Sequence, residues 1–541
     1  MRSLLLSLVP LVALTACSTD ESGGVPLFDG LGDHHHAITT ATPQAQAYFD
    51  QGLRLTYAFN HEEAIRSYEY ALELDPGCAM CWWGIAFAAG PNINAAMDST
   101  AGALAWDAIQ DAVALAPDVS DEERAYIHAL AERYGPDPLA ERAAKDSAYA
   151  VAMSRLADRS PDDDDAQVLY ADALMNLAPW DYWNPDGRPR AGTEKILSAL
   201  QRVVERSPEH AGACHLYIHA VEKVDAERAV ACAERLPDLM PAAGHIVHMP
   251  AHIFIRVGRY VEAIEHNHTA THADELYLDA ERPGGIYPLA YYPHNYDFLA
   301  FAAAMAGHRT EALDAARRGA LAVDHEMMVV PELGGLQNYL LLPLRIMSRF
   351  GMWEEILEEP LPGTDQDFVV GFSHYARGMA LLRTGRSSDA AAELERLRAR
   401  LDSPGIEPYA IWWNPAAQIL SLGVLALEAE LLYATGDDGR AVALLERAVA
   451  LEDGLVYDEP PPWSIPSRQV LGRIHFERDR FAAAEAVFRA DLAKYPENGW
   501  SLYGLARSLE ARGEATEAAT VMARYERAWS TADVDPVTGT H

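Results

Sequence analysis

Histidines crowd into one stretch of this chain, and their spacing is the feature of the sequence best suited to chemistry. Of the 20 histidines among 541 residues, ten fall within positions 210–294. In that stretch His215 and His219 are four residues apart, and so are His248 and His252. Side chains at this spacing project from the same face of a helix. Pairs of neutral imidazoles on one face bind divalent transition metals well, so the pattern indicates a metal site.

The histidine pairs also repeat in a common register, which adds further candidates. His248 follows His215 by 33 residues, and His252 follows His219 by the same interval. Two glycines give a second register, because Gly258 follows His245 by thirteen residues and Gly307 follows His294 by the same interval. In this register Asp297 corresponds to His248. If each interval is one helical hairpin, the two pairs lie at equivalent heights on adjacent helices. The expected ligands are His215, His219, His245, His248, His252, His294 and Asp297.

The kind of metal follows from the ligand atoms. A site made mainly of nitrogen ligands suits copper, zinc or iron better than magnesium or calcium, and we expect copper before the other two. The run His34-His35-His36 is a further source of ligands if its segment folds back, and His35 joins the candidates on that basis. A disordered tether is the alternative for that segment. A groove that binds a peptide carboxylate or another anion is the alternative for the whole cluster.

The elements that position these side chains are expected to be helices. Hydrophobic residues make up 50% of the chain, and the alternating β-branched runs that mark strands are nearly absent. Between positions 48 and 76, small, aromatic and proline residues stand at regular intervals: Tyr48, Gly52, Ala64, Tyr68, Ala71 and Pro76. Here the sequence resembles the tetratricopeptide-repeat (TPR) family. The resemblance implies an all-α, TPR-like right-handed superhelix of antiparallel helical hairpins, whose first helices line a concave groove.

Related units recur along most of the chain, as at Gly513 and Ala518, where a glycine precedes an alanine by five residues. We therefore expect an N-terminal TPR-like array over 45–300, which contains the histidine-rich groove. A C-terminal TPR-like array follows over 301–530, and a tail over 531–541. Several stretches interrupt the period and are expected to form loop insertions: 178–192, 279–292, 358–367, 401–413 and 453–466.

The N-terminus resembles a bacterial lipoprotein signal. An apolar run over 4–14 leads into Thr15-Ala16 before Cys17, and it is shorter than the roughly 20 residues that span a bilayer. The resemblance implies a signal peptide over 1–16, a lipidated Cys17 and a tether over 17–44. Because Ser18 rather than aspartate follows the cysteine, it also implies anchoring in the bacterial cell envelope, at the outer membrane and facing the periplasm. The lipid is then the only expected contact with the membrane.

Four further cysteines, an even number, favour disulfides in such an oxidising compartment. Cys214 and Cys232 fall on two successive expected helices and are candidates to join them. Cys78 and Cys81 are close in sequence, and a local disulfide is favoured there over a redox pair or a soft metal site.

Composition and motifs limit the functions. A formal net charge of −37 at pH 7 repels phosphate backbones, so nucleic acid is not expected as a partner. The sequence has no HExxH motif, serine elbow or phosphate-binding glycine loop, so no reaction is assigned. Two functions stay open: a metalloprotein, either enzyme or metal carrier, and a TPR scaffold that binds a peptide or an envelope protein. Asparagines clamp peptide backbones, which makes Asn92 and Asn94 candidates for the scaffold reading. Packing within the hairpin is the favoured role of the nearby Trp82 and Trp83.

Overall fold

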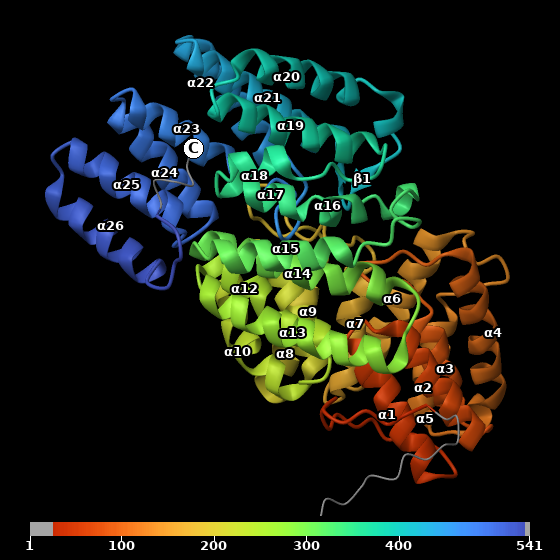
Figure 1. Ribbon diagram of the computed structural model, residues 1–541. Helices are drawn as coiled ribbons and strands as arrows, with labels where there is room; N and C mark the ends of the chain where they lie inside the picture. The colour runs from red at the N-terminus through yellow and green to blue at the C-terminus, as the bar shows by residue number, and fades with distance from the viewer. Residues whose placement is uncertain (1–24, 536–541) are drawn as a thin grey trace, which may run out of the picture.

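A computed structural model describes residues 25–535, and within that range the chain is a succession of antiparallel helical hairpins (Figure 1). The only ladder among the described residues has two residues on each side, where β1 (Ala410–Ile411) pairs antiparallel with β2 (Asn414–Pro415). These observations confirm the all-α, TPR-like fold class. The segment 1–16 and Cys17 lie outside the described residues.

The helices follow one another with short connections, and most of them pair with their neighbour in the chain. The N-terminal part contains α1 (Pro43–Tyr57), α2 (His61–Leu74), α3 (Ala79–Ala88), α4 (Ser99–Leu115), α5 (Asp121–Ala131), α6 (Arg142–Arg159), α7 (Asp164–Met175), α8 (Thr193–Arg206), α9 (Ala211–Val221), α10 (Val230–Leu239), α11 (Gly244–His248), α12 (Pro250–Val257), α13 (Tyr260–Glu281) and α14 (Tyr292–Ala306). A short π-helical turn, η3 (Tyr287–Tyr291), leads into α14.

The C-terminal part continues the same pattern. It contains α15 (Arg309–Leu321), α16 (Leu336–Leu340), α17 (Leu342–Arg349), α18 (Trp353–Glu358), α19 (Asp367–Arg383), α20 (Ser387–Leu401), α21 (Ala416–Ala434), α22 (Asp438–Asp453), α23 (Ser467–Glu477), α24 (Phe481–Lys494), α25 (Gly499–Ala511) and α26 (Ala515–Ala528). Four 3-10 turns complete the secondary structure of the described residues: η1 (Ala116–Asp118), η2 (Ala226–Ala229), η4 (Pro331–Leu333) and η5 (Pro404–Ile406).

The first hairpin follows the expected pattern of small and aromatic residues. Tyr68 on α2 is fully buried, and its ring lies against Gly52 on α1 and Gly84 on α3. A Cβ added at either glycine would come within 2.5 Å of a ring carbon of Tyr68. The two glycines therefore set how closely α1 and α3 approach α2.

The last hairpins return to the middle of the chain. The indole nitrogen of Trp500 donates a hydrogen bond to the carbonyl of Ala304, and that of Trp529 donates to the carbonyl of Met305. Both acceptors lie at the end of α14, and each donor–acceptor distance is 2.9 Å. Both tryptophans belong to the same large hydrophobic core as α1 to α14. Position 300, the expected border between two arrays, lies inside α14, which pairs with α15. α14 and α15 thus form one hairpin across the expected border.

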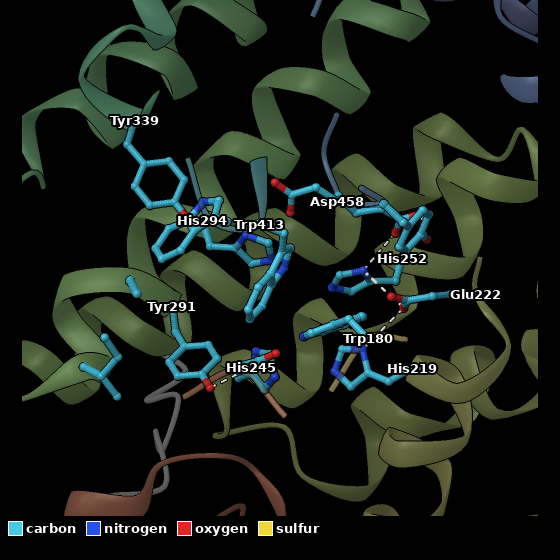
Figure 2. A pocket seen from close by; sticks show the side chains of 16 residues that line it. Trp180, His219, Glu222, His245, His252, Tyr291, His294, Tyr339, Trp413 and Asp458 are labelled. Atoms are coloured by element: carbon cyan, nitrogen blue, oxygen red, sulfur yellow. Dashed lines mark hydrogen bonds and ion pairs between the residues drawn. The ribbon is translucent and has the colours of Figure 1, made fainter. Parts of the chain in front are cut away.

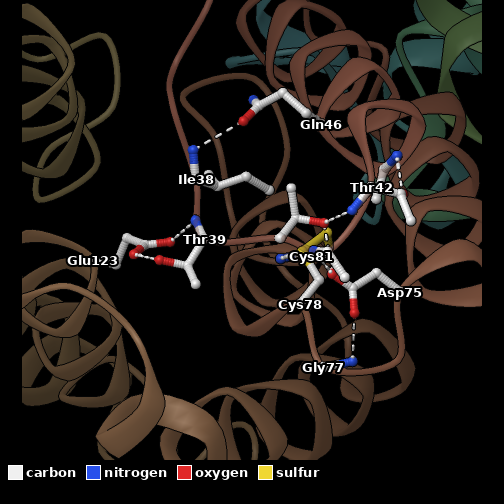
Figure 3. The surroundings of a disulfide bond; sticks show 12 residues. Ile38, Thr39, Thr42, Gln46, Asp75, Gly77, Cys78, Cys81 and Glu123 are labelled. Atoms are coloured by element: carbon white, nitrogen blue, oxygen red, sulfur yellow. Dashed lines mark hydrogen bonds between the residues drawn. A yellow bond between two sulfur atoms is a disulfide. The ribbon is translucent and has the colours of Figure 1, made fainter.

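The described part of the expected tether packs onto the helices. Between residues 25 and 44, backbone N–H groups of Ile38 and Thr39 donate to the side chains of Gln46 and Glu123 (Figure 3). The hydroxyl of Tyr48 donates to the carbonyl of Val25. These contacts join the segment to α1 and α5, so its described residues form part of the folded structure.

The cysteines occur in two close pairs. Cys78 and Cys81 form a disulfide at the start of α3 (Figure 3), which confirms the expected local bridge. Cys214 on α9 and Cys232 on α10 are buried thiols whose sulfur atoms lie 2.6 Å apart. The structure therefore brings the second expected pair together without a covalent bond.

One described helix, α21, is long and apolar enough to cross a membrane by length and composition, whereas the lipid is the only membrane contact expected from the sequence. Half of its apolar stretch is buried, and it packs against α19, α20 and α22. A core helix has the same composition, which accounts for its apolar character.

Candidate metal centre

Six of the expected ligands meet near the middle of the chain. They come from α9, from the consecutive helices α11 and α12, and from α14: His215, His219, His245, His248, His252 and His294. Pro250 begins α12 and separates it from α11, since a proline without an N–H is tolerated at the start of a helix but not in its interior. The stripe of histidines continues across this break, with Nε2 of His248 and Nε2 of His252 in contact.

The six imidazoles form two groups, each with ligand atoms within 4.8 Å of one another. The first triad is His215, His219 and His245, and the second triad is His248, His252 and His294. Nε2 of His215 lies 3.2 Å from Nε2 of His219, and the Nε2 atoms of His248 and His252 are 3.0 Å apart. Two nitrogens bound to one tetrahedral ion, each at about 2.0–2.1 Å, are about 3.3 Å apart. Each pair is thus close to the separation of two ligands of one ion.

The two triads are in contact with each other. The ring centroids of His219 and His252 are 5.3 Å apart, and those of His245 and His248 are 5.9 Å apart. Within the first triad, the centroids of His215 and His219 are 4.9 Å apart. Because rings of different triads are nearly as close as rings of one triad, the two groups form a single site.

A phenylalanine packs against each triad. Phe59 contacts the three rings of the first triad at centroid distances between 4.4 Å and 6.2 Å, and Phe298 contacts those of the second triad at 4.5 Å to 5.0 Å. Phe298 follows His294 by one helical turn on α14. Phe59, in the turn between α1 and α2, has a φ of 58°, which residues other than glycine adopt infrequently. These rings restrict the orientations of the imidazoles.

Hydrogen bonds at the outer ring nitrogens fix two tautomers. Nδ1 of His215 lies 2.6 Å from the carbonyl oxygen of Tyr57, and Nδ1 of His248 lies 2.7 Å from Oδ1 of Asn267. A carbonyl oxygen only accepts, so Nδ1 of His215 donates. The amide nitrogen of Asn267 donates to the carbonyl of Ala263, which leaves Oδ1 as the acceptor for His248. In both histidines Nε2 therefore carries a lone pair that faces another imidazole nitrogen.

Two buried carboxyl groups lie beside the Nδ1 atoms of His219 and His252. Oε2 of Glu222 lies 3.4 Å from Nδ1 of His219 and 3.3 Å from Nδ1 of His252, so it contacts one histidine of each triad (Figure 2). Oε2 of Glu459 lies 2.9 Å from Nδ1 of His252. Burial raises the pKa of Glu222 well above its usual range and that of Glu459 to about 7. Burial thus disfavours the ionised form of both groups, and a nearby cation would favour it.

The imidazoles are neutral at pH 7. Burial lowers the pKa of His215 and that of His248 to about 4, and it lowers the pKa values of the other four well below the ordinary value. His245 is 1% exposed, and neither of its ring nitrogens has a hydrogen-bond partner among the described residues. A buried polar atom without a partner is costly, and a bound ion would supply one.

A cavity of about 100 Å³ opens onto both triads (Figure 2). Aromatic side chains form much of its wall beside the histidines: Trp180, Tyr291, Tyr339, Trp412, Trp413 and Tyr457. Trp180 and Trp412 have φ values of 63° and 51°, and such strained backbone is concentrated at functional sites. The insertions 178–192, 401–413 and 453–466 all contribute to this wall, so the site is a covered cavity rather than the expected open groove.

Asp297, an expected ligand, lies outside both triads. It is buried, and its Oδ1 lies 3.4 Å from Nη1 of Arg345 on α17. The register with His248 does not bring it to the ligand atoms, because the buried guanidinium of Arg345 requires a counter-charge and Asp297 supplies it.

His35 also lies elsewhere. Its Nδ1 is 2.7 Å from Oδ2 of Asp50, and its side chain is 55% exposed. Neighbouring side chains of an extended segment point to opposite sides. His34 and His36 accordingly face inward while His35 faces outward.

His34, His36 and His210 surround the buried carboxylate of Asp165. Their distances to its oxygens are 3.0 Å, 2.8 Å and 3.3 Å. Nδ1 of His210 accepts a hydrogen bond from the backbone N–H of Ala213, so its Nε2 carries a proton and donates to Asp165. This cluster is therefore a hydrogen-bonded hub that joins the N-terminal segment to α7, unlike the triads, where lone pairs converge.

Sequence reasoning missed the outer partners of the triads. Glu222 follows His219 by three residues, a helical spacing that could have marked it. Glu459 lies in the loop between α22 and α23, far from the histidines in the sequence, and had no such signal.

The residues considered for peptide binding have structural roles. Oδ1 of Asn92 accepts the backbone N–H groups of Asn94 and Ala95 in its own turn. The amide nitrogen of Asn94 donates to the hydroxyl of Tyr291 in the cavity wall. Trp83 is 2% exposed, as the packing role predicts.

No protein-family profile and no curated protein sequence matches this chain. Solved structures that resemble it include the Cut9–Hcn1 hetero-tetramer of the APC/C, at 12% identity and a TM-score of 0.30, over 93% of this chain and 77% of that chain. Human IFIT1 with m7Gppp-AAAA resembles it at 12% identity and a TM-score of 0.33, over 92% of both chains. The TPR domain of P58(IPK) does so at 11% identity and a TM-score of 0.23, over 87% of this chain and 99% of that domain.

Proposed function

We propose that this chain binds two transition-metal ions, one in each triad, with copper favoured over zinc and iron. The observation that carries the proposal is the pair of facing nitrogens in each triad, 3.2 Å and 3.0 Å apart. In each pair one histidine, His215 or His248, has an unprotonated Nε2 whose lone pair faces the other nitrogen. A proton or a metal ion must therefore lie between the two nitrogens. The third histidine of each triad then completes a set of three nitrogen ligands.

The carboxylates fit the metal-bound state. To act as ligands at Nε2, His219 and His252 must hold their protons at Nδ1. Glu222 and Glu459 stand at those nitrogens and can accept the N–H groups. Outer partners of this kind orient ligating imidazoles and make them better donors, which supports the proposal.

The ligand set favours copper. All six ligands are neutral imidazoles, whereas the di-iron sites of helical bundles use glutamates directly as ligands. For a given set of nitrogen ligands, copper(II) binds more tightly than the other divalent ions of the first transition series.

The cavity gives both ions a free side. His219 and His245 of the first triad line it, as do His252 and His294 of the second. Three protein ligands with an open position are typical of catalytic metal sites, so we favour a reactive centre over a metal carrier. A TPR-like array also presents long outer surfaces, on which a protein partner can bind independently of the metal site.

Metal analysis tests the proposal. Protein purified without a histidine tag or added chelator, from cells supplied with copper, should contain two equivalents of transition metal per chain. The variant His248→Ala/His252→Ala should lose the ion of the second triad. The variant His268→Ala/His272→Ala, with the same spacing on the exposed face of α13, should keep both ions. Less than one equivalent in the unmodified chain, or equal losses in the two variants, would contradict the proposal.

We also propose that the chain is anchored in the bacterial envelope through a lipid on Cys17, at the outer membrane. The support is the resemblance of residues 1–17 to a lipoprotein signal, together with a disulfide of the kind that persists in oxidising compartments. Cys17→Ser should move the protein from the membrane fraction to the soluble fraction. Retention of the variant in the membrane fraction would argue against the lipid anchor.

A further inference from the structure

We infer that the two ions form one dinuclear copper centre, which binds dioxygen in the cavity between the triads. The inference rests on the proposed metal binding. It adds that the two ions act together, and it names the class of molecule that they bind.

The two triads lie close enough together for one small molecule to contact both ions. The rings of His219 and His252 belong to different triads, yet their centroids are 5.3 Å apart. One carboxylate oxygen of Glu222 contacts Nδ1 of both rings, so a single side chain fixes a ligand of each ion relative to the other. Since both triads line the same cavity, one small molecule there can contact both ions.

The size and wall of the cavity carry the second step. A cavity of about 100 Å³ holds several water molecules, since one water needs only about 10–15 Å³ of such space. A diatomic molecule therefore fits beside the ions. The edge of Trp180 meets His219 at a centroid distance of 5.0 Å, and Tyr291 meets His245 at 4.7 Å (Figure 2). These aromatic rings give the cavity a largely apolar wall beside the ligands, which suits an apolar molecule such as dioxygen.

The ligands suit the electron balance of the reaction. Each copper(I) ion, held by three neutral imidazoles, gives one electron to dioxygen and becomes copper(II). Dioxygen gains two electrons, its O–O bond order falls from two to one, and each oxygen forms a bond to copper. No proton and no further reductant is required. The carboxylates of Glu222 and Glu459, behind His219 and His252, stabilise the additional positive charge of the copper(II) state.

The test begins with metal-free protein that is loaded without oxygen with two equivalents of copper(I). Bound copper is counted first, and dioxygen is then admitted. The inference predicts uptake of one dioxygen per pair of ions. It also predicts that integrated electron paramagnetic resonance accounts for only a small part of the bound copper, because the two copper(II) ions are magnetically coupled through the bridging oxygen.

Variants and alternative outcomes keep the test decisive. His245→Ala, which removes a cavity-lining ligand of the first triad only, should abolish dioxygen uptake. An added one-electron oxidant, which takes one electron from the second-triad copper(I), should then give a full resonance signal from that ion. His268→Ala/His272→Ala should behave as the unmodified chain. Two bound ions that both give full, independent signals after oxygen is admitted, or that take up no dioxygen, would overturn the dinuclear centre while leaving metal binding intact. Fewer than two bound ions at the loading step would overturn the proposed function and this inference together.

Discussion

The carboxylate of Glu222 meets the imidazole of His252 between α9 and α12, with 3.3 Å between Oε2 and Nδ1. The same oxygen also contacts His219. The change Glu222→Gln keeps the shape of the side chain but cannot ionise beside a bound cation, so it weakens the orientation of both imidazoles. We expect metal affinity to fall about 10-fold to 100-fold, as measured by competition with a chelator of known affinity.

Glu234→Gln is the matched control for that change. Its carboxylate is 52% exposed and contacts only Arg259 among the ion pairs of the described residues. The control should leave metal affinity unaltered. If Glu222→Gln binds metal as tightly as the control, Glu222 has no role in holding the ligands.

The change Asp297→Asn separates a structural role from a ligand role. Arg345 is buried beside Asp297, and a buried charge that loses its partner costs about 3–5 kcal/mol. The free energy of unfolding of the metal-free variant, measured with denaturant, should fall by an amount of this order. Metal content should stay at two equivalents. Loss of an ion without loss of stability would instead make Asp297 a ligand.

The attachment of the N-terminal segment should depend on pH through His36. Burial by itself lowers the pKa of His36, but the hydrogen bond from its ring to Asp165 and the nearby charges of Asp165, Asp163 and Asp50 raise it above the ordinary value of about 6.5. A raised pKa means that the stabilising effect is complete below about pH 6.5 and is lost as pH rises through the folded-state pKa. The melting temperature of the unmodified chain should therefore exceed that of His36→Gln by more at about pH 6 than at about pH 8. An equal difference at both values would contradict this account.

Asp165 should anchor the same segment over the complementary range. Burial alone raises its pKa, but hydrogen bonds from His210, His34 and His36 hold the pKa well below its usual range. Its stabilising effect is thus present above about pH 4 and is lost as pH falls through the lower folded-state pKa. At neutral pH, Asp165→Asn should lower the free energy of unfolding by about 2–3 kcal/mol, because a buried hub of charge-assisted hydrogen bonds is lost. Asp164→Asn, next to it but paired with Arg206 at the surface, should have a much smaller effect.

Close packing in the first hairpin predicts opposite effects at two glycines. Gly52→Ala would place a Cβ within 2.5 Å of the Tyr68 ring, so we expect a loss of about 1–3 kcal/mol of stability from overpacking. Gly439→Ala in α22 meets no atom within 4 Å and should stabilise the helix by about 0.5–1 kcal/mol. Denaturant unfolding of both variants checks the prediction, and equal changes at the two positions would contradict it.

The buried thiols of Cys214 and Cys232 should form a disulfide on oxidation, because their sulfur atoms are already in contact. Protein isolated from an oxidising compartment, unfolded and alkylated without reduction, should then show no alkylation at Cys78, Cys81, Cys214 or Cys232 by mass spectrometry. Alkylation confined to Cys214 and Cys232 would show that they remain thiols.

The sequence predicts the helical architecture and most of the histidine cluster because both depend on periodic spacing. Four-residue intervals identify His215 with His219 and His248 with His252, and the repeat length brings the two pairs side by side. The same reasoning fails at Asp297, since spacing states which way a residue faces but not which partner it meets. Arg345, on a later helix, forms an ion pair with the Asp297 carboxylate.

The covering of the site lies beyond such reasoning. Trp180, Trp412 and Glu459 come from insertions that have no period, and two of them adopt backbone conformations that their residue types rarely favour. His35 illustrates the same limit. Its neighbours His34 and His36 turn inward because a buried aspartate from α7 accepts their hydrogen bonds, and nothing local in the sequence indicates that contact.

The contact between His252 and Glu459 joins residues that are 207 positions apart in the chain. All six histidines of the two triads are therefore synthesised well before Tyr457 and Glu459, which lie beside them in the folded chain. A nascent or prematurely terminated polypeptide would hold open, unsupported imidazoles, and the complete centre arises only after translation has passed that loop.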